Sequence, residues 1–298
     1  MRPEGVRVTP TLQDWWQGGE TAVLTVDGTP RKVFVRRAGS GPTVVLLHGF
    51  PASSFEWAAV ESELARHREV VTFDFLGYGS SEKPAGHRYS IFEQTDLAEA
   101  VIAAYAPTAT AVVAYDYGAI VATELLARRE ERPTDIRRAI LLNAGLFPDK
   151  YRPRLAQRAS LLPVVGALVA RLFTESLFFK TWSEVFSTEH PLKRELAAEH
   201  YRALRENDPD GDVQRKLLRY IPERAAHTAR FEKALTHTDV PLSFLWGMRD
   251  PVSGSAIAGE VRARMPEADL VEYTDAGHCP HIEIPDRVAA DVLRRTAI

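Results

Sequence analysis

The stretch AVVAYDYGAI, residues 111–120, decides how this chain folds, because it joins an apolar strand to a helix through one sharp turn. Residues 111–115 form an unbroken apolar run, which is typical of a buried strand, and a helix pattern starts at Tyr117. Small side chains flank the turn, so the side chain at its apex, Asp116, is lifted clear of the backbone. The apex of this turn is therefore a candidate site for chemistry.

Asp116 is a candidate nucleophile. An aspartate carboxylate is ionised at neutral pH, so it can attack carbon without a base to deprotonate it. The intermediate formed by such an attack is an aspartyl ester. Capping of the following helix is the alternative role for an aspartate that follows a strand.

A second buried-strand pattern, TVVLLHGFP at residues 43–51, ends in a His-Gly-Phe-Pro turn. Where such a turn lies beside a nucleophile elbow, it supplies one backbone N–H to an oxyanion hole, and the residue after the nucleophile supplies the other. The predicted donors are the N–H groups of Phe50 and Tyr117.

Asp250 and His278, which come later in the chain, complete a candidate catalytic triad with Asp116. Residues 241–247 predict another buried strand, Asp250 follows it closely, and His278 lies in the later segment DAGH. The chain order nucleophile, acid, histidine is that of the α/β-hydrolase triad, with His278 as general base and Asp250 fixing its tautomer. Taken singly, a surface histidine and a turn aspartate are the alternatives.

With these residues in place, the chain resembles the α/β-hydrolase superfamily, and within it the Asp-nucleophile branch of epoxide hydrolases and haloalkane dehalogenases. The loops DFLGYGSSEKP at residues 74–84 and GHCPHIE at residues 277–283 also carry this resemblance. Four segments, residues 73–79, 89–94, 116–118 and 143–148, are similar to the mesoderm-specific transcript protein of vertebrates. The resemblance implies an eight-stranded, mostly parallel sheet and a helical cap inserted after the sixth strand.

The remaining pattern agrees with that architecture, because short β-rich runs alternate with helix patterns. Strands are expected at residues 21–26, 31–37, 43–48, 70–74, 110–115, 136–143, 241–247 and 269–273. Helices are expected near residues 54–66, 91–105, 117–129, 253–264 and 285–295. Two hairpin strands followed by alternating units predict a mostly parallel sheet with helices on both faces.

The alternation stops after the sixth strand, where the pattern becomes helical. We therefore expect a hydrolase core at residues 1–147 and 237–298 and a helical cap at residues 148–236. Such an insertion covers the carboxyl ends of the strands and walls off an apolar pocket. The expected pocket-lining residues are Phe50, Phe178 and Trp182, and packing within the cap is the alternative for the last two. Arg171 interrupts the apolar part of the predicted cap, and a charged residue there argues against a membrane span.

Composition sets the expected class of partner. The 298 residues are 45% hydrophobic and 26% charged, which suits one α/β domain with an insertion. The net charge of −3 does not favour binding to nucleic acid or acidic membranes, which are themselves negatively charged. We therefore expect a small apolar or weakly polar substrate. We expect no cofactor or metal. The first residues lack a signal-peptide pattern, and Cys279 is the single cysteine, so a cytoplasmic protein without an intrachain disulfide is expected. The oligomeric state is open.

The leaving group separates the possible activities. The resemblance implies that dehalogenases carry Asn after His-Gly and Trp after the nucleophile, whereas this chain has Phe50 and Tyr117 there. Its His-Gly-Phe-Pro turn resembles epoxide hydrolases, which use two cap tyrosines to protonate the opening ring. The candidate donors are Tyr151, Tyr201 and Tyr220. We expect an epoxide hydrolase, with a haloalkane dehalogenase or a non-catalytic small-ligand-binding scaffold as alternatives.

Overall fold

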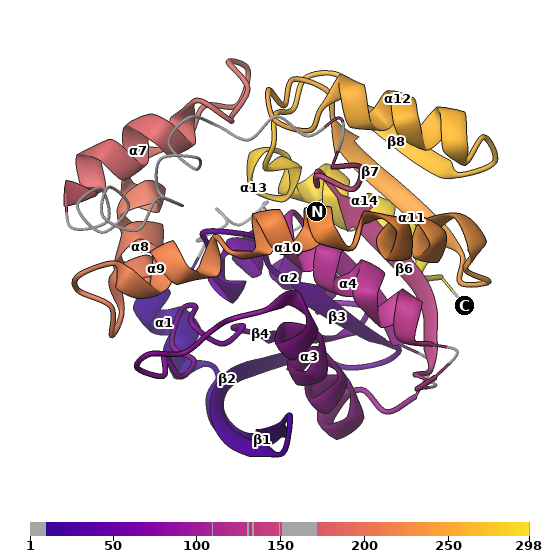
Figure 1. The fold of residues 1–298 in the computed structure, drawn as a ribbon. Helices are drawn as coiled ribbons and strands as arrows, with labels where there is room; N and C mark the ends of the chain where they lie inside the picture. Colours follow the sequence, from indigo (N-terminus) through magenta and orange to yellow (C-terminus); the bar gives the residue numbers. More distant parts are fainter. Residues whose placement is uncertain are drawn as a thin grey trace, which may run out of the picture.

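The computed structural model describes residues 10–108, 110–129, 131–132, 134–148, 150 and 172–297. Within these residues eight strands form one sheet in the order β1-β2-β4-β3-β5-β6-β7-β8 (Figure 1). The strands are β1 (Glu20–Val26), β2 (Thr29–Gly39), β3 (Thr43–Leu47), β4 (Glu69–Phe73), β5 (Thr110–Tyr115), β6 (Ile136–Leu142), β7 (Leu242–Gly247) and β8 (Asp269–Tyr273).

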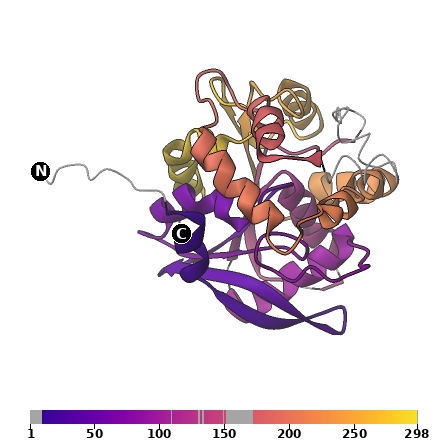
Figure 2. The same ribbon diagram turned by 90° about the vertical axis from the view of Figure 1, so that its left-hand side faces the viewer.

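Pairing in the sheet confirms the predicted, mostly parallel arrangement. β1 and β2 form an antiparallel hairpin, β2 pairs antiparallel with β4, and every pair from β4 to β8 is parallel. Each observed strand begins and ends within two residues of its predicted bounds. Figure 2 shows the indigo hairpin at the bottom of the molecule, with the helices between β6 and β7 above it.

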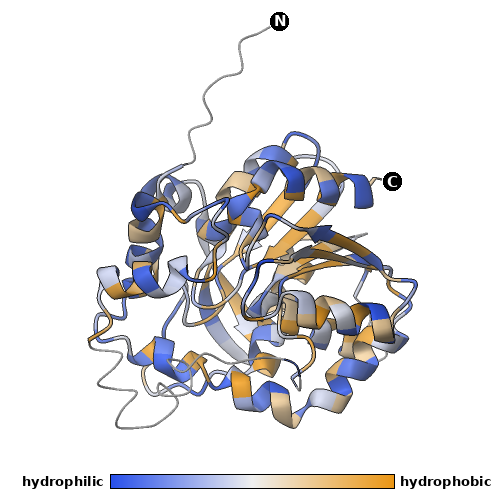
Figure 3. Ribbon diagram, turned by 90° about the horizontal axis from the view of Figure 1, so that it is seen from above, coloured by the Kyte–Doolittle hydropathy of each residue, from blue (hydrophilic) through white to orange (hydrophobic). Residues whose placement is uncertain are grey.

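The central strands are apolar on both faces because helices cover both sides of the sheet. Side chains of successive strand residues point to opposite faces. In β5, Ala111, Val113 and Tyr115 belong to one hydrophobic cluster, and Val112 and Ala114 belong to the other. This explains why the sequence shows an unbroken apolar run there instead of an alternating one. Figure 3 shows the hydrophobic strands enclosed by helices whose outer faces are hydrophilic.

The predicted core helices are present with small corrections. They are α3 (Ile91–Tyr105), α4 (Tyr117–Arg128), α12 (Ser255–Arg264) and α14 (Pro285–Arg295). The expected helix at residues 54–66 is instead a 3-10 turn, η1 (Ser54–Trp57), followed by α2 (Ala58–Leu64). Two short helices, α1 (Leu12–Gln17) and α13 (Pro280–Glu283), were not predicted, because segments of six and four residues are too short to show a helical period.

Helices fill the described part of the segment between β6 and β7. They are α7 (Glu175–Ser183), α8 (Arg194–Arg205), α9 (Asp212–Leu217), α10 (Tyr220–Ala226) and α11 (Thr228–His237). α7 packs against α8, and α11 packs against α4 of the core. Tyr151 and Arg171 lie outside the described residues. In the described part of the chain, no helix combines the length and the apolar composition that a membrane span requires.

Candidate active site

Asp116 occupies the turn between β5 and α4 in a backbone conformation that few side chains adopt. Its φ is 46° and its ψ is −112°. A non-glycine residue held in this region costs on the order of 1–3 kcal/mol, so the surrounding packing must impose it. Gly118 shows that packing, because a Cβ there would lie 2.5 Å from the carbonyl oxygen of Leu47. The small residue beside the apex therefore lets the elbow press against β3.

The structure brings the three predicted triad residues together from three separate loops. His278, after β8, has its Nδ1 2.7 Å from Oδ2 of Asp250, which follows β7. The other ring nitrogen, Nε2, lies 3.7 Å from Oδ2 of Asp116. The second oxygen of Asp116, Oδ1, accepts a hydrogen bond of 3.2 Å from the N–H of Phe50. The two oxygens of Asp116 therefore face different partners.

Asp250 is held by residues that the sequence analysis did not identify as site residues. Its Oδ2 accepts from Nδ2 of Asn143 at 2.9 Å and from the hydroxyl of Ser253 at 2.5 Å. Asn143 in turn accepts from the N–H of Gly247 at 2.7 Å, which ties the end of β6 to the end of β7. The location of Asn143 could have marked it as a site residue, because it is a polar residue directly after a buried strand that neighbours β5.

The histidine loop is anchored to the helical segment and to α13. The backbone N–H of His278 donates to the carbonyl of Val185 at 2.8 Å. Glu283, in α13, accepts from the N–H groups of Gly277 at 2.9 Å, Cys279 at 3.2 Å and Ser187 at 2.9 Å. Glu283 therefore holds the backbone on both sides of His278, a role that no sequence motif had indicated.

The two buried carboxylates decide the charge on His278. Burial of the imidazole by itself lowers its pKa, but Asp250 and Asp116 outweigh burial and raise the pKa of His278 to about 10. Burial raises the pKa of Asp250, yet the charge and hydrogen bond of His278, with the bonds from Ser253 and Asn143, bring this pKa below its usual value. Both carboxylates thus stabilise a positively charged ring.

The predicted oxyanion-hole donors lie at the two expected turns. Phe50 donates to Asp116, and Tyr117 is the first residue of α4, where a backbone N–H has no partner within its own helix. His48 fixes the first turn: its Nε2 accepts from the N–H of Phe75 at 3.0 Å, so its Nδ1 carries the proton and donates to the carbonyl of Gly49 at 3.0 Å.

Aromatic side chains enclose the turn at Phe50. The ring centroid of Tyr220, on α10, lies 4.9 Å from that of Tyr117 and 6.0 Å from that of Phe50. Tyr220 is buried, and Phe50 is half-buried. Of the two predicted cap tyrosines that the structure describes, Tyr201 and Tyr220, it is Tyr220 that lies beside the turns at Phe50 and Tyr117.

Tyr201 makes its hydrogen bonds to residues of the helical segment. Its hydroxyl donates to the carbonyl of Phe173 at 2.8 Å and accepts from Nε of Arg205 at 3.2 Å. Phe178 and Trp182, predicted as pocket lining, pack against each other with ring centroids 5.1 Å apart. They belong with Tyr201 to one hydrophobic cluster, whereas Phe50 and Tyr220 belong to the other. Phe178, Trp182 and Tyr201 thus follow the alternative of packing within the helical segment.

Known proteins are similar to this chain in sequence and in fold. The family model described as "Alpha/beta hydrolase family" matches residues 44–291. The chain belongs to the alpha/beta hydrolase family. LipZ of Mycobacterium tuberculosis is 37% identical over 288 residues, which cover 96% of this chain and 98% of that protein. The human mesoderm-specific transcript homolog protein is 32% identical, covering 94% of this chain and 86% of that protein. This confirms the resemblance found in the sequence.

Haloalkane dehalogenases are also similar to this alpha/beta hydrolase. Haloalkane dehalogenase 2 of Mycobacterium tuberculosis is 28% identical over 265 residues, covering 86% of this chain and 88% of that protein. The crystal structure of the haloalkane dehalogenase DatA from Agrobacterium tumefaciens C58 has a TM-score of 0.76 at 21% identity, covering 94% of this chain and 98% of that one. At this identity the structural likeness shows the shared fold alone.

Proposed function

We propose that this alpha/beta hydrolase forms an ester between Asp116 and its substrate and then hydrolyses that ester, and that the substrate is an epoxide. The observation that carries the ester mechanism is the position of Asp116 between Phe50 and His278. Its Oδ1 accepts from the N–H of Phe50, and its Oδ2 lies 3.7 Å from the histidine, beyond hydrogen-bond distance. We therefore assign the attack on carbon to Oδ2 and the hydrogen bond from Phe50 to Oδ1.

In the first step, Oδ2 of Asp116 attacks a ring carbon and the C–O bond of the epoxide breaks. The departing alkoxide is far more basic than a phenolate, so it needs a proton donor. Tyr220 supports this choice of substrate, because it lies against the rings of Phe50 and Tyr117 above the nucleophile turn. It would give its hydroxyl proton to the alkoxide.

In the second step, water attacks the ester carbon of Asp116 while His278 takes a proton from that water. Oδ1 becomes the oxyanion, and the backbone N–H groups of Phe50 and Tyr117 stabilise it. Collapse of the tetrahedral intermediate breaks the bond between the ester carbon and the alcohol oxygen. The leaving alkoxide takes the proton that stays on the hydroxyl added from water, so the diol is released and the carboxylate of Asp116 is restored. The proton taken from water restores the charged ring of His278 that the free enzyme has near neutrality, and Tyr220 regains a proton from solvent, so the overall reaction adds one water to the epoxide.

A haloalkane is the second candidate substrate, and the 28% identity to haloalkane dehalogenase 2 favours it. The ester mechanism is the same, but a halide leaves without a proton and needs only N–H or O–H donors. Here the hydroxyl of Tyr117 would replace the tryptophan donor of the family's dehalogenases. A non-catalytic scaffold is disfavoured, since ligand binding alone does not require the aligned Asp116, His278 and Asp250.

The leaving group can be tested with Tyr220→Phe. For an epoxide substrate we expect ring opening to slow by about 10²-fold, because the proton donor is lost. Diol formation from styrene oxide and bromide release from 1-bromobutane are measured for the wild type, Tyr220→Phe and Tyr117→Phe. Tyr201→Phe is the matched control, and we expect it to be nearly silent because its hydroxyl bonds to Phe173. Bromide release that depends on Tyr117 and not on Tyr220 would instead establish the dehalogenase.

The two half-reactions should also respond differently to pH. In the free enzyme Asp116 and Asp250 raise the pKa of His278 to about 10, so the ring is protonated near neutrality. Esterification removes the charge of Asp116, so the pKa of His278 falls and the neutral base becomes accessible. We expect the rate of ester hydrolysis to rise with pH through an apparent pKa below 10, while alkylation stays nearly constant from about pH 6 to 9. Rapid-quench measurements give the rates of both steps across this pH range. A rate of ester hydrolysis that does not change with pH would refute the assignment of His278 as the base.

A further inference from the structure

Glu56 is a buried carboxyl group that the mechanism above does not use. It lies in η1 and is 3% exposed. Its Oε1 accepts a hydrogen bond of 2.7 Å from the backbone N–H of Gly49. Its Oε2 makes no hydrogen bond within the described residues, and the Nε2 atom of buried His281 lies 3.6 Å from it. A buried carboxyl on an active-site turn calls for a specific role, because its desolvation is costly.

Glu56 and His48 hold Gly49 from two sides. Glu56 accepts from the N–H of Gly49, and His48 donates to its carbonyl. That carbonyl shares a peptide plane with the N–H of Phe50, so fixing it also fixes the direction in which Phe50 donates. A Cβ at Gly49 would lie 2.7 Å from the ring of Tyr115 and 2.9 Å from the Cβ of Asp116. The turn is thus packed directly against the nucleophile.

We propose that Glu56 is a positioning residue that holds Gly49 so that the N–H of Phe50 stabilises the oxyanion formed during hydrolysis of the Asp116 ester. This inference rests on the proposed ester mechanism and deepens it. The oxyanion forms only in the second step, since attack on an sp³ carbon creates none. Loss of Glu56 should therefore slow hydrolysis more than alkylation.

The charge state of Glu56 agrees with this role. Burial is the largest influence and raises its pKa to about 8, with the charge of Asp116 acting in the same direction and His48 and the Gly49 N–H opposing it. At pH 7 the carboxyl is therefore mostly neutral and adds little negative charge beside the nucleophile. A glutamine has the same shape and the same acceptor oxygen, so it is a conservative replacement.

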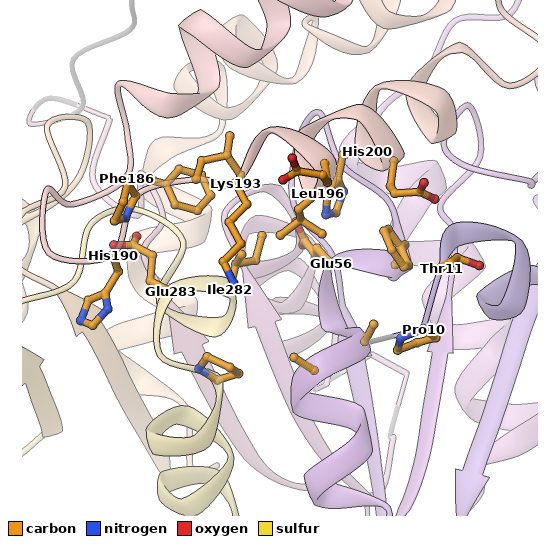
Figure 4. Close-up of a pocket in the computed structure, with 18 of the residues that line it drawn as sticks. Pro10, Thr11, Glu56, Phe186, His190, Lys193, Leu196, His200, Ile282 and Glu283 are labelled. Carbon is orange, nitrogen blue, oxygen red and sulfur yellow. The ribbon is translucent and has the colours of Figure 1, made fainter. Parts of the chain in front are cut away.

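Glu56 is one of the residues that line a cavity. Its volume is about 850 Å³, and its walls include Glu56, Phe55, Leu196, His200 and Ile282 (Figure 4). Asp116, Asp250 and His278 do not line it. A formate ion is small enough to enter this cavity and to occupy the position of a deleted Glu56 carboxyl.

The test compares both half-reactions in Glu56→Ala and Glu56→Gln. We expect Glu56→Ala to slow ester hydrolysis by about 10²-fold, the usual cost of one oxyanion-hole donor, and alkylation by about threefold or less, so that the ester accumulates. Glu56→Gln should hydrolyse the ester within about threefold of the wild type, because it keeps the acceptor for Gly49. Glu61→Ala is the matched control. It removes another buried carboxyl, that of Glu61 on α2, which accepts a hydrogen bond from Arg36 on β2, and it should leave the ratio of the two steps unchanged.

Sodium formate supplies a second readout. Added to Glu56→Ala at ionic strength matched with sodium chloride, it should raise the rate of ester hydrolysis in a saturable way. The wild type and Glu61→Ala should not respond. If Glu56→Ala does not fold, Glu56→Leu fills the same space and takes its place in the kinetic comparison. The proposal would be overturned if Glu56→Ala slowed alkylation and ester hydrolysis equally. It would also be overturned if Glu56→Gln hydrolysed the ester as slowly as Glu56→Ala does without formate.

The position of the turn can be measured without the reaction. The backbone amide resonances of Gly49 and Phe50 in the full chain should shift in Glu56→Ala and return toward the wild-type values in Glu56→Gln. Resonances that stay unmoved would overturn the positioning role itself. If the wild type formed no ester but the resonances shifted in Glu56→Ala, the proposed function would be refuted. The role of Glu56 in holding the turn would still stand.

Discussion

His278→Phe is expected to stop turnover and to leave the substrate attached to Asp116 as a stable ester. A carboxylate attacks carbon without giving up a proton, so the first step needs no base, whereas water cannot attack the ester efficiently without one. Intact-mass measurement of the variant after incubation with mixed epoxides and haloalkanes should show the adduct. An epoxide adds its whole mass to the protein, whereas a haloalkane adds its alkyl group and loses the halide. The adduct mass therefore identifies the substrate class as well as the mechanism.

Asp116→Asn is the control for that experiment, because an amide is a poor nucleophile of nearly the same shape. We expect it to lower turnover by about 10⁴-fold or more and to give no adduct, alone or combined with His278→Phe. Peptide mapping should place the adduct of His278→Phe on Asp116. If His278→Phe carries no adduct from a substrate that the wild type turns over, the ester mechanism is wrong.

Asp250→Asn is expected to lower turnover by about 10⁴-fold while alkylation of Asp116 continues. Nδ1 of His278 lies 2.7 Å from Oδ2 of Asp250, an arrangement that keeps Nε2 available to accept a proton. An amide at this position can present an N–H to Nδ1, which favours the wrong tautomer and no longer stabilises the charged ring. Rapid-quench kinetics should show ester formation at close to the wild-type rate, followed by slow hydrolysis.

Asp275→Asn is a matched control, since Asp275 lies three positions before His278 but bonds to the exposed Arg287. It should leave both half-reactions unchanged. Asn143→Ala should cause a smaller loss than Asp250→Asn, about tenfold, because it removes one of the hydrogen bonds that orient Asp250. Loss of alkylation in Asp250→Asn, with the fold intact by circular dichroism, would assign Asp250 to the first step instead.

Local patterns in the sequence were sufficient to predict the framework. An apolar run, a sharp turn and a helix pattern are properties of neighbouring residues, so β5, Asp116 and α4 could be predicted together. The same holds for His48 to Pro51 after β3. Parallel strands end at a common edge of the sheet, so the order of the motifs was enough to predict that Asp116, Asp250 and His278 converge. The structure brings these three residues within hydrogen-bonding or near-contact distance, while their catalytic roles stay predictions.

Contacts between distant segments could not be predicted in this way. The hydrogen bonds of Asn143 to Asp250 and of Glu283 to Ser187 join residues about a hundred positions apart, and the motifs that contain Asn143 and Glu283 did not indicate these partners. The cap tyrosines show the same limit. Tyr201 lies on α8 and Tyr220 on α10, and only the packing of these helices decides which ring lies beside Phe50 and Tyr117.

The sequence by itself thus determined the order of the elements, the sheet and the residue type at the elbow, because each depends on the properties of a few consecutive side chains. The tertiary structure alone decided which polar groups support them. Glu56 illustrates the physical reason: seven positions from Gly49, on a turn without a recognisable period, its carboxyl becomes an anchor for the oxyanion turn only when packing removes it from water and aims it at one backbone N–H.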